Sequence, residues 1–161
     1  MKLLAPVLLL LFSQCKIHNK NSKEDFKTGA FSISEVKHYK WFKPVYRNYH
    51  FSKVVADSLT AFKGFSITII GGEWCSDTRL QLPQFVKILE TIRYPEEKVK
   101  IILVDRKKEC FKCEGYSKEK YNITLVPTFI VFDRSGKEKG RIIEKPSVTL
   151  EDDLLKIFNQ Q

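Results

Sequence analysis

The chain has 161 residues, of which 43% are hydrophobic and 12% aromatic, enough for one domain with an apolar core. With 29% charged residues between dense apolar segments, the composition excludes an intrinsically disordered protein. The formal net charge is +9, but the basic residues are scattered and often adjoin acids, as in Glu96-Glu97-Lys98. We therefore expect no nucleic-acid partner, and assign the charge to solubility and some affinity for membranes.

The first residues predict export. Lys2 is followed by an uncharged segment, Leu3 to Phe12. This segment is too short to span a bilayer, which needs about 20 residues, but it suits the apolar part of a signal peptide. Ser13-Gln14-Cys15 follows, and the arrangement resembles a bacterial lipoprotein signal, in which a cysteine after small residues becomes the lipid-bearing first residue. A plain cleaved signal peptide and a buried N-terminal helix are the alternatives.

The resulting organisation has three parts. We expect a signal peptide over 1–14, a polar tether over 15–30, and one domain over 31–161. The protein is expected in the cell envelope or periplasm, anchored to the membrane by a lipid on Cys15.

The domain should begin with two helical segments. Ser34 is a candidate N-cap for a helix whose apolar residues recur every three or four positions, and Pro44 should kink or split it. A second helix is expected from near Ser52 to Gly64. The remaining elements are expected, in chain order, as a strand over 65–70, a helix over 77–92, a strand over 99–104, a short helical piece over 117–121, strands over 128–132 and 137–144 joined by a turn, and a helix capped by Thr149.

The order of these elements predicts the fold class. The strand over 99–104 is almost entirely aliphatic, which is typical of a strand buried on both faces. Strands that alternate with helices and end in a hairpin predict an α/β fold with a mixed sheet covered on both faces.

The candidate reactive residue is Cys75, in the sequence Trp74-Cys75-Ser76-Asp77-Thr78, where the first clear strand gives way to a helix. The unpaired N–H groups and dipole at a helix N-terminus favour thiolate over thiol. The thiolate is the nucleophile in disulfide exchange. A buried and inert cysteine is the alternative, but the loop Gly-Gly-Glu-Trp-Cys-Ser-Asp is a poor setting for one.

These residues resemble the thioredoxin superfamily. Glu73-Trp74-Cys75 matches the start of the family's Trp-Cys-x-x-Cys motif, and Pro83 lies eight residues after the cysteine. Val126-Pro127-Thr128 matches the family's cis-proline segment and the strand that follows it. The resemblance covers roughly 60–160 and is nearest to the branch with a Trp-Cys-x-Asp motif. It implies a thioredoxin-like mixed β-sheet flanked by helices, with extra N-terminal helices.

The resemblance also implies a function. We expect a thiol–disulfide oxidoreductase that acts on protein thiols or disulfides, in which Cys75 attacks a substrate disulfide. Trp74, Val126 and Pro127 should form the substrate groove, and the Val126–Pro127 bond should be cis.

Two departures from the family pattern alter the expected site. Thr78 stands at the position of the second motif cysteine, and its hydroxyl is expected to donate a hydrogen bond to the Cys75 thiolate. Ile69 stands where thioredoxins often bury an aspartate, so proton transfer should fall to Asp77, to Glu73 or to water.

A second cysteine pair, Cys110 and Cys113, follows the strand over 99–104. Active sites of open α/β sheets gather where such strands end, so this pair should lie on the same side of the sheet as Cys75. Three roles stay open: a local disulfide that pins the loop, a resolving pair for Cys75, or a soft-metal site that includes Cys75.

The sequence contains no phosphate-binding loop, nucleophile elbow or His-Glu-x-x-His helix, and we expect no cofactor and no metal. The alternative function is a non-catalytic thioredoxin-fold binding module, such as a chaperone or soft-metal carrier.

Overall fold

The computed structural model describes residues 26–62 and 64–160, so the predicted signal peptide and most of the predicted tether lie outside it. The elements in chain order are β1 (Gly29–Phe31), α1 (Ile33–Val36), α2 (Phe42–Asn48), α3 (Lys53–Leu59), β2 (Ser66–Gly71), α4 (Ser76–Thr91), β3 (Val99–Leu103), β4 (Thr128–Phe132), β5 (Glu138–Ile143) and α5 (Leu150–Asn159). Short 3-10 helices lie at Thr60–Phe62 and Glu96–Lys98.

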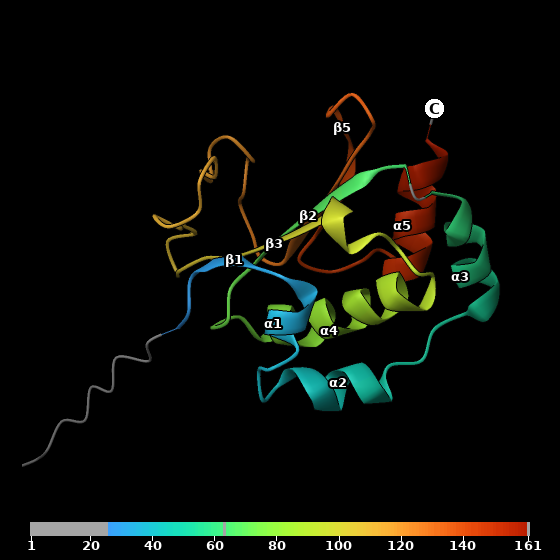
Figure 1. Ribbon diagram of the computed structural model, residues 1–161, viewed down its shortest axis with the longest axis horizontal. Helices are drawn as coiled ribbons and strands as arrows, with labels where there is room; N and C mark the ends of the chain where they lie inside the picture. The colour runs from blue at the N-terminus through green and yellow to red at the C-terminus, as the bar shows by residue number, and fades with distance from the viewer. Residues whose placement is uncertain (1–25, 63, 161) are drawn as a thin grey trace, which may run out of the picture.

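The sheet has five strands in the order β1-β3-β2-β4-β5 (Figure 1). The central strands β2 and β3 are parallel, with Ile69 opposite Ile101, and every other pair is antiparallel. All residues of β2 except Ser66 are buried, which explains its continuous apolar sequence. The predicted mixed α/β fold is confirmed.

The helices form the main core against one face of this sheet. The core cluster joins apolar side chains of α1 to α5 to those of β2, β3, β4 and β5. At its centre Phe85 of α4 stacks on Phe129 of β4, with ring centroids 4.4 Å apart. Burial of side chains of this size is the largest source of stability in such a core.

The other face of the sheet is covered by a loop. Ile70, Ile102 and Ile130 pack there against side chains of the segment 104–126, and no helical residue in the described ranges joins this cluster. The short helical piece predicted over 117–121 is wrong, because these residues form hydrogen-bonded turns, including one from Ile123 N to Lys118 O. A loop, rather than a helix, therefore covers the sheet beside Cys75.

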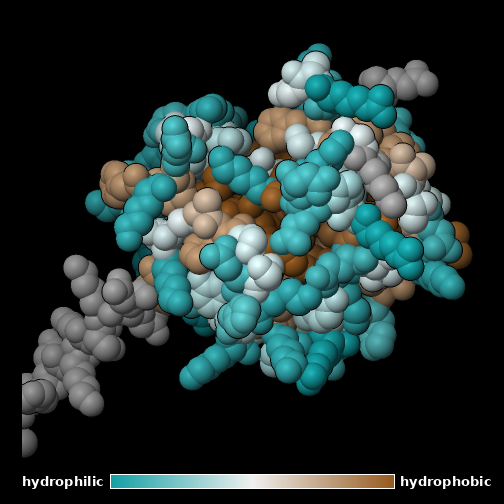
Figure 2. Space-filling model, viewed as in Figure 1, coloured by the Kyte–Doolittle hydropathy of each residue, from teal (hydrophilic) through white to brown (hydrophobic). Residues whose placement is uncertain are grey.

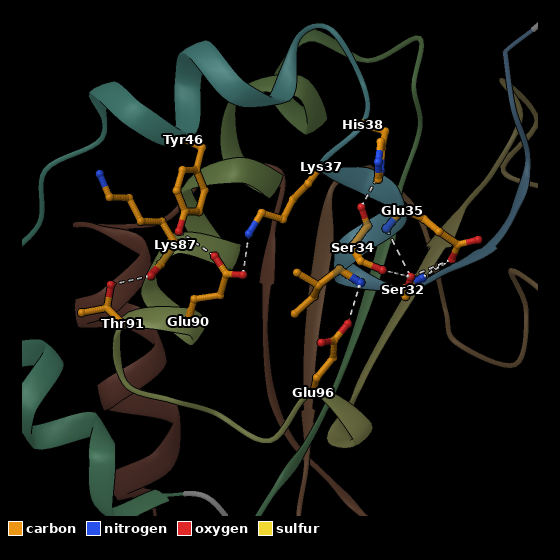
Figure 3. A network of polar contacts seen from close by, with 11 residues as sticks. Ser32, Ser34, Glu35, Lys37, His38, Tyr46, Lys87, Glu90, Thr91 and Glu96 are labelled. Carbon is orange, nitrogen blue, oxygen red and sulfur yellow. Dashed lines mark hydrogen bonds and ion pairs between the residues drawn. The ribbon is translucent and has the colours of Figure 1, made fainter.

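The N-terminal helices are tied to α4 through Glu90 (Figure 3). One oxygen of Glu90 accepts a hydrogen bond from the Tyr46 hydroxyl at 2.6 Å, and the other lies 2.7 Å from Lys37 Nζ. Burial, together with the neighbouring Glu90 carboxylate, raises the pKa of Tyr46 to about 12, so this hydroxyl stays a donor at neutral pH. These helices are thus part of the domain.

Three features at the start of the domain differ from the sequence prediction. The first helix is capped by Ser32, not Ser34, because Glu35 completes a capping box with Ser32. The strand β1 was not predicted, because a three-residue strand carries no periodic signal. It begins at Gly29, two residues before the predicted domain start, and pairs with β3. The predicted helix is split, but between Val36 and Phe42 and not at Pro44, which lies in the first turn of α2 where proline is tolerated.

The surface is mixed in polarity. Hydrophilic residues cover most of the face seen in Figure 2, and hydrophobic residues show mainly toward its middle. Within residues 26–62 and 64–160, no helix is long and apolar enough to cross a membrane.

Candidate active site

Cys75 is the N-cap residue of the 16-residue helix α4 and the free cysteine among the described residues. Its backbone is extended, its side chain is partly exposed, and a turn bond from Cys75 N to Gly72 O (2.9 Å) links it to the end of β2. The Cys75 thiol donates a hydrogen bond to the carbonyl oxygen of Val126, at 3.2 Å.

The Val126–Pro127 segment lies directly against the thiol, although 51 residues separate Val126 from Cys75 in the chain. The peptide bond between Val126 and Pro127 is cis. Thr128 Oγ1 donates to Leu125 O at 2.7 Å, which fixes the turn that leads into β4. The fold therefore brings the cysteine and proline segments into contact, although they lie far apart in the sequence.

Trp74 is held beside the thiol by a hydrogen bond from its Nε1 to Val104 O, at 3.0 Å. The guanidinium of Arg106 lies 5.4 Å from the centre of the Trp74 ring. A Cβ at Gly72 would lie 2.6 Å from the indole, so a residue without a side chain is needed for this tryptophan to fold back onto the strand.

The position of Thr78 differs from the prediction. Thr78 is fully buried, and its hydroxyl accepts a hydrogen bond from Gly72 N at 3.1 Å. The hydrogen-bond partner of Cys75 Sγ is the Val126 carbonyl and not Thr78. The expected Thr78 bond to sulfur is therefore wrong in this structure, because the buried N–H of Gly72, just beyond the end of β2, takes the Thr78 hydroxyl as its acceptor. Thr78 therefore connects the first turn of α4 to the backbone that follows β2.

The two candidate acids have different environments. Glu73 Oε2 accepts a hydrogen bond from Lys27 N at 2.9 Å, so this carboxylate is bound to the segment before β1. Asp77 lies in the first turn of α4, partly exposed, and its side chain makes no hydrogen bond or ion pair within the described part of the chain. Ile69 is fully buried in β2. The side chain of Asp77 is thus unengaged among the described residues, whereas that of Glu73 is hydrogen-bonded.

Cys110 and Cys113 form a disulfide. Both are buried, with 6% of each exposed, and they belong to the cluster against which Trp74 and Cys75 pack. Because both sulfurs are bonded, neither is available to a metal in this state. Among residues 26–62 and 64–160 there is no group of three or more side chains suited to holding a metal ion.

Sequence reasoning missed two residues near the site. Gln81 is buried on α4, and its amide nitrogen donates to the backbone oxygen of Glu144. Glu144 N in turn donates to Pro127 O at 2.7 Å. The sequence offered one signal for Gln81: it is a polar residue on the face of the predicted helix that Leu82 and the other inward-facing residues occupy.

Comparison with known proteins identifies the family. Residues 31–154 match the family model described as thioredoxin. The chain belongs to the thioredoxin family. The match begins before α1, so the N-terminal helices of this thioredoxin-family protein, which the sequence resemblance left outside, lie within the matched domain. No curated protein matches the sequence.

One solved structure supports the fold, and a second shows a weaker likeness. A protein of unknown function from Pseudomonas aeruginosa superposes with a TM-score of 0.55 at 13% identity, over 78% of this chain and 90% of that one. Thioredoxin O2 from Arabidopsis thaliana, in its oxidised state, gives a TM-score of 0.44 at 19% identity, over 66% and 85% of the two chains. At 13% identity, the likeness to the Pseudomonas aeruginosa protein concerns the fold of this thioredoxin-family protein and not its substrates.

Proposed function

We propose that this protein is a thiol–disulfide oxidoreductase of the cell envelope that uses Cys75 as its single motif nucleophile. The observation that carries the proposal is the free, partly exposed Cys75 thiol at the N-terminus of α4, 3.2 Å from the Val126 carbonyl. Membership of the thioredoxin family supports an oxidoreductase-like role on protein thiols or disulfides.

The first chemical step is disulfide exchange. The Cys75 thiolate attacks one sulfur of a substrate disulfide, the substrate S–S bond breaks, and a mixed disulfide forms while the other substrate sulfur leaves as a thiolate. Cys75 is the N-cap residue of α4, whose first N–H groups have no acceptor within the helix and can hydrogen-bond an anion. We assign proton exchange with the site to Asp77, which lies in the first turn of the same helix. Trp74, Val126 and Pro127 form the groove that receives the substrate chain.

The second step needs another thiol, because Thr78 replaces the second motif cysteine. A partner thiol, or one of Cys110 and Cys113, attacks Cys75 Sγ, releases the reduced substrate and takes its place in a disulfide with Cys75. The substrate's own second cysteine instead attacks the substrate sulfur, which forms a new substrate disulfide and releases the Cys75 thiolate. A reduced Cys110–Cys113 pair that resolved the intermediate would end as a disulfide beside a free Cys75. This is the combination present in the structure.

The second candidate function is a binding module that uses the same groove without turnover. Thr78 favours it, because its buried hydroxyl serves the β2 strand end and not the sulfur. The test is reduction of insulin disulfides with dithiothreitol as the electron source. We expect the protein to accelerate reduction well above the dithiothreitol background, whereas a rate equal to background would favour the binding module.

The envelope location is a separate proposal that rests on the first fifteen residues. We expect the mature chain to begin at Cys15 and to fractionate with membranes, because the apolar segment and the cysteine after it resemble a lipoprotein signal. Cys15→Ala should release the protein or block its processing, and Ser22→Ala, in the same polar segment, should change neither. Wild-type protein that is soluble and retains Met1 would refute the proposal.

A further inference from the structure

Gln81 is a polar residue in an apolar place. It lies on α4 with 4% of its surface exposed, next to Leu82 and one turn before Phe85, both in the main core. Its amide oxygen is buried and has no hydrogen-bond partner within residues 26–62 and 64–160. A buried amide with one partner missing is costly, so its one hydrogen bond is the feature to explain.

That hydrogen bond goes to the backbone oxygen of Glu144, 63 residues away and just beyond the end of β5. Glu144 has a φ of 57°, in the left-handed region that is unfavourable for a residue with a side chain. A bond from Lys145 N to Ile143 O (2.6 Å) closes a tight γ-turn around it. Such backbone persists only where its surroundings hold it in place.

The backbone N–H of the same turn binds the Val126–Pro127 segment, which contacts the reactive thiol. Glu144 N donates to Pro127 O at 2.7 Å, and the neighbouring Val126 O accepts from Cys75 Sγ at 3.2 Å. Three hydrogen bonds therefore connect two positions of α4 through the Glu144 turn. Gln81 bonds to Glu144, Glu144 bonds to the Val126–Pro127 segment, and this segment bonds to Cys75.

We infer that Gln81 is a positioning residue, which braces the turn at Glu144 so that the Val126–Pro127 segment stays aligned with Cys75. This inference rests on the proposed function for its catalytic meaning, because Gln81 does not touch the reacting sulfur. Leucine at this position would fill similar space and remove the brace. The Glu144 turn would then lose its hydrogen bond to α4, only the Cys75 contact with Val126 would remain, and the substrate groove would lose its fixed shape.

The test compares Gln81→Leu with Gln84→Leu. Gln84 lies on the same helix, is partly exposed and makes no side-chain hydrogen bond among the described residues. Hydrogen exchange at the Glu144 amide, normalised to global stability, should be at least about 10-fold faster in Gln81→Leu and unchanged in Gln84→Leu. Equal protection in both variants would overturn the inference. Gln81→Met, which is unbranched like glutamine, takes the place of Gln81→Leu if that variant does not fold.

Kinetics separate positioning from stability. In the insulin assay, KM should rise at least about fivefold in Gln81→Leu with kcat within about twofold, because the groove and not the nucleophile is altered. Adding Glu144→Gly should bring KM back toward wild type, since glycine adopts positive φ without strain. A lower melting temperature with unchanged KM would show a merely structural role and contradict the inference. Inactive wild-type protein would refute the proposed function, while the exchange comparison would still decide whether Gln81 braces the turn.

Discussion

Replacing Cys75 with serine should lower insulin-disulfide reduction at least about 100-fold, to the dithiothreitol background. A serine hydroxyl is not ionised at neutral pH and does not exchange with disulfides, so no mixed disulfide can form. The fold should survive, because a serine Oγ can donate to the Val126 carbonyl as the thiol does. The measurement is the initial rate of insulin reduction by the two proteins at equal concentration.

Two controls make this comparison decisive. Near-ultraviolet circular dichroism should be the same in both proteins, since Trp74 and its bond to Val104 O report on the packing of the site. Cys75→Ala should be as inactive as the serine variant. Residual activity above about a tenth of wild type, in a correctly folded variant, would place the chemistry on another thiol.

Replacing both Cys110 and Cys113 with serine should destabilise the protein by about 2 kcal/mol or more. The disulfide closes a short loop, with a sequence separation of 3, so its entropic contribution is about 2 kcal/mol. Two serine hydroxyls in this buried cluster add a further cost unless they find partners. The measurement is the free energy of unfolding in urea, for the double variant and for wild type.

The activity of this double variant separates the two remaining roles of the pair. Full reductase activity would show that the disulfide only pins the loop over the second face of the sheet. Loss of activity, with Cys75 still alkylated as fast by iodoacetamide as in wild type, would show that the pair resolves the mixed disulfide. Alkylation is the necessary control, because a collapsed loop would also disturb Trp74 and Cys75, which pack against the same cluster.

The parts of the fold that the sequence predicts well are those with local signals. The strand over 128–132 coincides with β4, and Thr149 caps α5, with its hydroxyl accepting from Asp152 N. Cys75 could be placed at the start of a helix because the strand before it and the helical period after it are each legible in a few residues.

The missed features depend on contacts between distant residues. β1 is a strand only because β3 offers it hydrogen bonds, and its three residues carry no pattern of their own. The hydroxyl of Thr78 is directed to Gly72 by the packing of α4 on the end of β2, which spacing alone does not reveal. The bond between Gln81 and Glu144 joins positions 63 residues apart through a turn with positive φ at a glutamate, for which the sequence has no signature.

The most direct test of the central claim is to identify the sulfur that forms the mixed disulfide. Protein with the Cys110–Cys113 disulfide intact is incubated with oxidised glutathione, quenched with acid and mapped by mass spectrometry without reduction. We predict glutathione on the peptide that carries Cys75, and Cys110 still bonded to Cys113. Glutathione on Cys110 or Cys113, or an unmodified Cys75 after prolonged incubation, would contradict the assignment of Cys75 as the nucleophile.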